Sequence, residues 1–354
     1  SSSTAAAPAI LISGTTDEAS TIRLGGDGVA LTTQGTSFAF PVTLKSGLNI
    51  YALSATDAAG NISTSTLNIS LLSLQVAITS PSAGQTISGP NAIVKGTVSG
   101  AANVGVSVNG TTASISGTQF VALIPVATGF NTIVAQAVSP SNGSATDTVS
   151  VSVANTPMPD SLQDVSVNVS TFNGLAPATI SVSVQDYKGR VSQVLIDFRG
   201  TGVYQVSATP ALGSNTYTYQ YTTPGLYTAR VKLLDNSGGP PYTYTYPILI
   251  RAVSELDQQL RSVLADMSSA LRRGDIETAL KYFTPAAAIQ YQPILADPGT
   301  NLSSLADQLG NIVDGTLSAG FAEYLIVRQT ASGKKGYLLY FLQMPDGAWR
   351  IAQM

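Results

Sequence analysis

Residues 47–61 read GLNIYALSATDAAGN, and this stretch decides the fold of the first part of the chain. Apolar residues alternate with small or polar ones, which is the period of a β-strand, and the DAAGN end is typical of a turn. A shift of 82 residues places GFNTIVAQA, residues 129–137, under the same stretch. The same shift aligns 14–71 with 96–153 without a gap, mainly through glycines, turn residues and aromatics. We therefore infer a tandem duplication.

Both copies contain a dipeptide suited to a two-residue β-hairpin turn, Asp27-Gly28 in the first and Asn109-Gly110 in the second. About seven short strands in roughly 80 residues predict an immunoglobulin-like sandwich for each copy. Residues 47–61 resemble the hairpin of bacterial Ig-like domains, which occur in secreted, multidomain surface proteins. The second copy has SPSNG (139–143) in place of the DAAGN turn, so that turn has diverged. The resemblance covers about 9–154 and implies a fold rather than an activity.

A proline-rich segment, NTPMPD (155–160), separates these copies from a third set of predicted strands. LIDFRGTG (195–202) and YTYQYTTPGLYTARV (217–231) resemble two stretches of PKD-like β-sandwiches. Arg199 and Thr201 depart from the Gly and Asp of that family. The resemblance implies a third β-sandwich.

After Arg251 the pattern changes to that of an amphipathic helix at 252–273 without Pro or Gly. Further helices are predicted at 276–283 and 302–313, followed by strands at 323–330, 336–344 and 348–354. Helices followed by a sheet, together with ALRRGDIETALKYF (270–283), resemble the NTF2-like α+β cone. The predicted fold is mostly β, with tandem Ig-like sandwiches and a C-terminal α+β domain. The predicted domains are 1–74, 75–155, 156–251 and 252–354.

Composition excludes several classes of protein. The chain has no Cys and no His, so we expect no disulfide, thiolate nucleophile, Ser-His-Asp triad or His-ligated zinc. The net charge of −3 and the lack of a basic run argue against nucleic-acid binding. The sequence contains no stretch of about 18 apolar residues, so we predict no membrane span. The opening SSSTAAAP has neither Met nor a signal peptide, which we interpret as a mature product. Ser/Thr/Gly-rich β sequence with little charge is typical of secreted or cell-surface bacterial proteins.

Two rows of tyrosines are the main candidate binding residues. Alternation places the members of each row on one face of their strand. If the two strands pair, six phenols form a patch for sugar rings or a protein partner. In the alternative, one row fills the sandwich core and the other makes cross-strand pairs. The residues are Tyr217, Tyr219, Tyr221, Tyr242, Tyr244 and Tyr246.

Other candidates have a functional and a structural interpretation. Five residues of the last domain could line a ligand pocket or pack its core. Carboxylate pairs at 17–18 and at 275 and 277 are expected to serve a turn and a helix start rather than catalysis. Calcium needs only oxygen ligands, but the two turns that offer them hold few acids, so we expect no cofactor. The pocket candidates are Tyr282, Tyr291, Tyr324, Arg328 and Trp349; the calcium candidates are Asp57, Asn61, Asp235 and Asn236.

Residues 1–156 are unusually poor in charge. A β surface of this kind can pack against copies of itself without desolvating ions. Residues 5–12 could also be a strand donated to a neighbour, or the first strand of their own domain. The sequence thus predicts a non-catalytic structural or adhesive surface protein, a subunit or decoration of a filament or surface layer, whose partners are itself or other surface proteins. The alternative is an accessory module that binds glycans or another ligand. The eight charged residues are Asp17, Glu18, Arg23, Asp27, Lys45, Asp57, Lys95 and Asp147.

Overall fold

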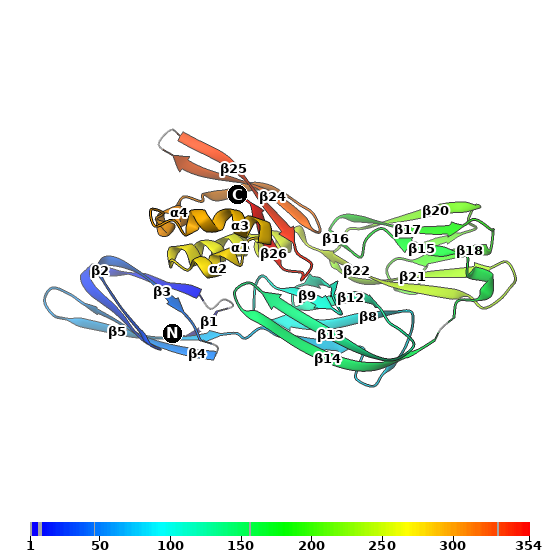
Figure 1. The fold of residues 1–354 in the computed structure, drawn as a ribbon, viewed down its shortest axis with the longest axis horizontal. Helices are drawn as coiled ribbons and strands as arrows, with labels where there is room; N and C mark the ends of the chain where they lie inside the picture. Colours follow the sequence, from blue (N-terminus) through cyan, green and yellow to red (C-terminus); the bar gives the residue numbers. More distant parts are fainter. Residues whose placement is uncertain (1, 6–8, 46, 156, 331–332) are drawn as a thin grey trace.

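The computed structural model describes residues 2–5, 9–45, 47–155, 157–330 and 333–354. As predicted, the fold is mostly β, with helices confined to the C-terminal part. Buried side chains form four hydrophobic clusters, which lie within 12–71, 74–153, 162–250 and 256–351. The first three form a row along the chain, and the C-terminal domain folds back over the first two (Figure 1).

The first repeat is one five-stranded sheet, in the order β1-β5-β4-β2-β3. Strands β2 and β3 pair along two stretches, with an irregularity between Thr15 and Ser20. This long hairpin takes the place of several of the short strands expected here, so the repeat has five paired strands where about seven were predicted. The elements are β1 (Ser2–Ala5), β2 (Ala9–Gly26), β3 (Val29–Thr43), β4 (Gly47–Thr56) and β5 (Ile62–Leu71).

The second repeat is a sandwich of two sheets, in the orders β10-β9-β13-β14-β7 and β11-β12-β8-β6. A shift of 82 residues maps β2 onto β8 and β9, and β3 onto β10, β11 and β12. The duplication is therefore visible in the backbone. The elements are β6 (Gln75–Ser80), β7 (Thr86–Ser88), β8 (Asn91–Ser99), β9 (Gly105–Val108), β10 (Thr111–Thr112), β11 (Ser114–Ser116), β12 (Gln119–Pro125), β13 (Gly129–Ser139) and β14 (Gly143–Ala154).

The predicted hairpin turns are confirmed. Asp27 and Asn109 both have φ 46°, and Gly28 and Gly110 follow with φ 85° and 79°. Consecutive positive φ values define a type I′ turn, which Asn-Gly and Asp-Gly adopt at low steric cost. The strands on either side pair directly across each turn, so each loop has two residues.

Both repeats contain the motif Gly-x-Asn, at 47–49 and 129–131, and its asparagine side chain hydrogen-bonds the backbone four residues earlier. Asn49 Oδ1 accepts a hydrogen bond from the N–H of Lys45 at 2.7 Å, and its Nδ2 donates to the Lys45 carbonyl at 2.8 Å. Asn131 makes the same pair of bonds with Ala127, and Asn215 makes them with Ala211. The motif thus recurs in the third sandwich, where the sequence analysis missed it.

The third sandwich has sheets in the orders β15-β17-β20 and β16-β22-β21-β18-β19. In all three sandwiches a short early strand pairs in parallel with the last strand: β1 with β5, β7 with β14, and β16 with β22. The elements are a 3₁₀ turn (Asp160–Leu162), β15 (Ser166–Val169), β16 (Asn173–Leu175), β17 (Ala178–Asp186), β18 (Val191–Asp197), β19 (Val206–Ala208), β20 (Gly213–Tyr221), β21 (Gly225–Asp235) and β22 (Tyr242–Arg251).

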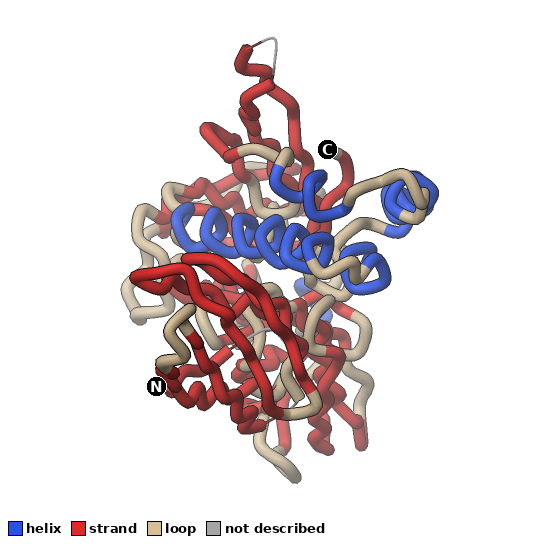
Figure 2. The backbone as a smooth tube through the Cα atoms, turned by 90° about the vertical axis from the view of Figure 1, so that its left-hand side faces the viewer, coloured by secondary structure: helices blue, strands red, loops and turns tan. Residues whose placement is uncertain are grey.

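The C-terminal domain packs helices on one face of a four-stranded sheet, in the order β23-β24-β25-β26. Helix α1 also lies against β2 of the first repeat (Figure 2). The elements are α1 (Val253–Arg272), α2 (Ile276–Leu280), α3 (Pro285–Leu295), α4 (Leu302–Asp307), β23 (Asn311–Leu317), β24 (Phe321–Thr330), β25 (Gly333–Gln343) and β26 (Trp349–Gln353).

Two helix predictions in this domain were wrong. The helix expected at 302–313 ends at Asp307, because Gly310 adopts φ 87° and the chain continues as β23. Helix α3 was not predicted, although Thr284 caps it by accepting the N–H of Ala287 at 3.3 Å and Pro285 occupies its first turn.

Candidate functional site

The six candidate tyrosines do not form the joint patch that pairing of their strands would give. Strand β20 pairs with β17, whereas β22 pairs with β21 and β16 in the other sheet of the sandwich. Both rows pack against the core between the sheets. Tyr221 donates a hydrogen bond to the Phe198 carbonyl at 2.7 Å, and Tyr246 donates to that of Val167 at 3.2 Å.

Aromatic contacts and burial also tie these rows to the sandwich. The Tyr219 ring stacks on Phe198 at 5.2 Å and meets Tyr221 edge-on at 4.8 Å. Tyr242 meets Tyr244 edge-on at 5.0 Å. Burial raises the pKa of Tyr244 to about 12, with a smaller contribution from Tyr242. The Tyr244 phenol therefore remains neutral at ordinary pH.

The second sandwich meets the backbone of the C-terminal domain through one side chain and one close approach of the two main chains. Asn103 Nδ2 donates to the Trp349 carbonyl at 2.9 Å, and its Oδ1 accepts the Trp349 N–H at 3.2 Å; both bonds are buried. Next to this pair, a Cβ added at Gly105 would lie 2.0 Å from the Ala348 nitrogen. Only glycine permits this approach.

A second junction lies at the start of α1. Glu255 accepts the N–H of Gly117 at 2.7 Å and the hydroxyl of Ser116 at 2.9 Å. The same carboxylate pairs with Arg251, at the end of β22, at 3.3 Å. One side chain thus connects the second sandwich, the third sandwich and the C-terminal domain.

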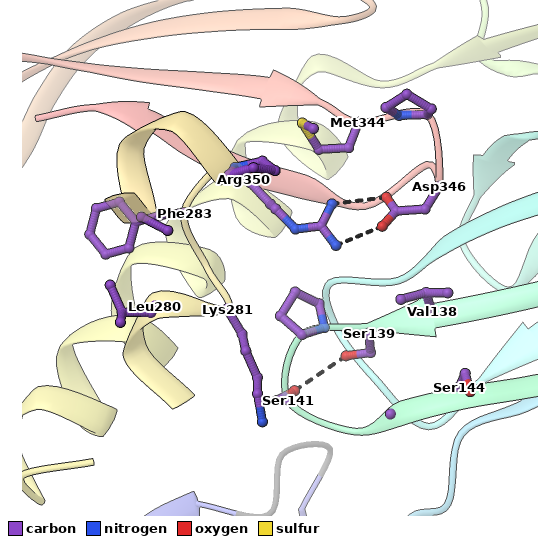
Figure 3. Close-up of a pocket in the computed structure, with 15 residues that line it drawn as sticks. Val138, Ser139, Ser141, Ser144, Leu280, Lys281, Phe283, Met344, Asp346 and Arg350 are labelled. Atoms are coloured by element: carbon purple, nitrogen blue, oxygen red, sulfur yellow. Dashed lines mark hydrogen bonds and ion pairs between the residues drawn. The ribbon is translucent and has the colours of Figure 1, made fainter. Parts of the chain in front are cut away.

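A pocket of about 750 Å³ lies between the second sandwich and the C-terminal domain, and sequence analysis did not predict it. The β13–β14 turn forms one side with serine hydroxyls, and Lys281 and the Arg350–Asp346 ion pair belong to the other (Figure 3). The remaining lining is largely apolar. It comes from Val138, Pro140, Leu280, Phe283, Pro285, Ala288, Met344 and Pro345.

Asp266 is the titratable group with an unusual environment near this junction. Burial raises the pKa of its carboxyl to about 6, although Arg273 and a hydrogen bond from Tyr282 oppose the shift. Tyr282 is buried and also hydrogen-bonds Ser141, in the turn that lines the pocket. The ionised carboxylate is thus disfavoured where the two domains meet.

We expect Asp266→Asn to stabilise the protein near pH 7. An unfolded aspartate has a pKa of about 3.9, so the folded state binds the Asp266 proton more tightly between about pH 4 and 6. The Asp266 contribution to stability therefore falls as pH rises through that range and stays low above it. The variant should exceed the parent by about 1–2 kcal/mol at pH 7.5 and match it near pH 4. Urea unfolding at both pH values measures this difference, and an equal effect at both would contradict it.

The candidate calcium ligands Asp57 and Asp235 hold the turns in which they lie. Asp57 accepts hydrogen bonds from the backbone and side-chain nitrogens of Asn61 at 2.8 and 2.7 Å. Asp235 accepts bonds from Ser161 and from the N–H groups of Ser237 and Gly239. Within the described residues, no three or more acidic side chains group as metal ligands would.

The five residues considered as a pocket lining of the last domain lie mostly in its core. Tyr282, Tyr324 and Trp349 are buried in the C-terminal cluster. Tyr324 donates a hydrogen bond to Asp257 at 2.7 Å, and Tyr291 donates to the Met354 carbonyl at 2.6 Å. The structural interpretation fits these four side chains.

Of the remaining carboxylate candidates, Asp275 and Glu277 have structural contacts through their side chains, and Glu18 has them through its backbone. Asp275 caps α2 by accepting the N–H of Thr278 at 3.0 Å, and Glu277 pairs with Lys281 on the surface. The Glu18 carbonyl accepts hydrogen bonds from two hydroxyls within its own loop. Across the described part of the chain, no helix is both long and apolar enough to span a membrane.

No protein-family model matches the sequence, and no curated protein matches it. Among solved structures, the fibronectin(III)-like modules of Clostridium thermocellum CbhA share 18% identity over 51% of this chain and 96% of theirs, with a TM-score of 0.20. Sidekick-1 immunoglobulin domains 1–4 share 12% identity over 71% of each chain, with a TM-score of 0.23. Bacteroides ovatus SGBP-B, in complex with a mixed-linkage heptasaccharide, shares 14% identity over 71% of this chain and 66% of its own, with a TM-score of 0.17.

The first two of these structures are tandems of fibronectin-like and immunoglobulin-like domains, and at these TM-scores none of the three carries an argument. The resemblances to bacterial Ig-like, PKD-like and NTF2-like domains stay predictions.

Proposed function

We propose that this chain is a non-catalytic structural or adhesive protein of the bacterial cell surface or exterior, which contacts further copies of itself. The sandwiches act as spacers, and the C-terminal domain fixes the first two against each other. The packing of α1 on β2, the backbone approach at Gly105 and the three-way contacts of Glu255 support a rigid arrangement of the domains. Rigid spacing is useful in a filament, a surface layer or a stalk.

The observation that carries the proposal is the chemistry of two hairpin faces. On β4–β5 and β13–β14, the residues that point away from the core include no charged side chain. They are mostly Ser and Thr, with large apolar side chains among them. Leu48 is 59% exposed, Ile62 66% and Phe130 93%. Such a face loses little ion hydration when another protein surface covers it.

Light scattering and negative-stain imaging over a range of protein concentrations test the proposal. We expect concentration-dependent oligomers or regular polymers. A protein that remains monomeric at about 1 mM would contradict self-contact. Removing residues 1–12 distinguishes association by donation of this N-terminal strand from other modes of self-association. In the structure Ser2–Ala5 pairs with β5 of its own chain and residues 10–12 belong to β2, while residues 6–8 lie outside the described chain.

The alternative, an accessory ligand-binding module, is favoured by the pocket between the second sandwich and the C-terminal domain. Its volume of about 750 Å³ lies within the range of small-molecule sites. Saturable glycan binding that Ser144→Trp abolishes would support it. Tyr219→Ala and Tyr244→Ala should instead lower stability, because both rings pack on the sandwich core.

A further inference from the structure

We propose that two copies associate face to face through hairpin β13–β14, with Phe130 of each copy entering the interdomain pocket of the other. This inference rests on the proposed function, because it names the surface and the partner for the self-contact. It assigns a role to two features that the fold itself leaves unexplained. One is an almost fully exposed aromatic ring, and the other is a largely apolar pocket whose rim carries ion-paired side chains.

Phe130 is the exposed feature. It is 93% exposed on the outer face of β13, while its neighbours Asn131 and Ile133 point inward. The Ser and Thr residues around it on β14 carry no charge. Large aromatic side chains on an otherwise polar surface are typical anchors of protein contacts.

The pocket offers the complementary chemistry. Its apolar lining suits a ring, and its charged side chains are ion-paired, Lys281 with Glu277 and Arg350 with Asp346. The hairpin face beside Phe130 has no charged side chain, so it brings no competing ion to either pair when the faces meet. The volume of about 750 Å³ also leaves room for the chain beside the ring.

The two features lie on the same face of one hairpin, at opposite ends. Val138 and Ser144, which share the outer face with Phe130, line the pocket. Eight residues of strand separate Phe130 from Val138, or about 27 Å at 3.4 Å per residue. A two-fold axis across the hairpin near Val134 therefore brings each Phe130 to the pocket of the other copy. One operation forms both contacts, as in an isologous dimer.

The size of this face sets the expected strength. Each outward residue of a sheet covers about 33 Å², from a strand spacing of about 4.8 Å and a repeat of about 6.8 Å. Ten such residues and the pocket remain below the roughly 800 Å² per partner of a standard stable complex. We therefore expect a weak dimer with a Kd of about 10–100 µM. When many copies are displayed on one surface, such weak contacts add up to a stronger overall association.

Sedimentation equilibrium of the full chain tests the proposal with two variants. Phe130→Ser removes the ring, and Ser144→Trp fills the pocket from an exposed position. We expect each to weaken association by about tenfold or more. The matched controls are Phe321→Ser, on the C-terminal sheet, and Ser214→Trp, on β20, which should associate as the parent does. Circular dichroism and thermal unfolding confirm that each variant is folded.

Mixing the two variants provides the decisive result. A mixed pair keeps one intact contact, because the Phe130→Ser copy has an open pocket and the Ser144→Trp copy has the ring. The mixture should therefore associate more strongly than either variant alone, and no gain on mixing would overturn the proposal. Association that survives Phe130→Ser would also overturn it while leaving the proposed function intact. A parent protein that is monomeric at about 1 mM would overturn both.

Discussion

Gly105→Ala should separate the second sandwich from the C-terminal domain. The added Cβ would lie 2.0 Å from the Ala348 nitrogen and 2.3 Å from the Asp346 carbonyl oxygen. Both are backbone atoms of the tight β25–β26 turn, so neither can swing aside as a side chain could. Relief requires the turn to move, which breaks the buried bonds between Asn103 and Trp349. We expect a loss of about 3 kcal/mol, combining overpacking with lost hydrogen bonds.

Small-angle X-ray scattering and urea unfolding measure this effect. The variant should have a larger radius of gyration and a transition in which the C-terminal domain unfolds separately. Gly320→Ala is the matched control, because its Cβ would meet no atom within 4 Å. A Gly105→Ala protein with unchanged scattering and stability would show that the close approach is not required.

Glu255→Ala is the second substitution with a large expected effect. It leaves the Arg251 guanidinium, whose side chain is only 14% exposed, without its carboxylate partner. It also removes the acceptor for Gly117 and Ser116. Breaking a buried pair from one side costs about 3–5 kcal/mol, and we expect about 2–3 because Glu255 is itself 32% exposed.

Thermal unfolding and limited proteolysis near residue 251 measure this loss. Glu277→Ala is the control, since its ion pair with Lys281 is exposed and worth less than about 1 kcal/mol. Equal effects of the two substitutions would contradict a role for Glu255 in joining the domains.

Local sequence patterns predicted the parts of the fold that depend on neighbouring residues. Asp27-Gly28 and Asn109-Gly110 predicted their turns because few residues tolerate positive φ. Periodicity predicted α1 because its apolar side chains recur at helical spacing. The tyrosine rows show what local patterns cannot predict. Alternation predicts that each row shares a face, but it does not tell which strand lies beside it.

The candidate site could not be predicted, because it depends on contacts between distant parts of the chain. Asn103 and Trp349 are 246 residues apart, and no periodicity connects them. The pocket combines a β-turn of the second sandwich with two segments of the C-terminal domain. In the sequence Phe130 stands out only because it aligns with Leu48 of the first repeat. Whether its side chain is exposed depends on which other segments pack against it.

The short parallel strands also determine how the sandwiches respond to pulling. In the second and third sandwiches, β7 and β16 lie early in the domain, and each pairs in parallel with the last strand of that domain. A force on the two ends of such a domain slides these strands past each other, so their hydrogen bonds bear the load together. A hairpin pulled from its open end would instead lose its bonds one at a time. A tether built from these two sandwiches therefore resists stretching where β7 and β16 pair with the last strand of their domain.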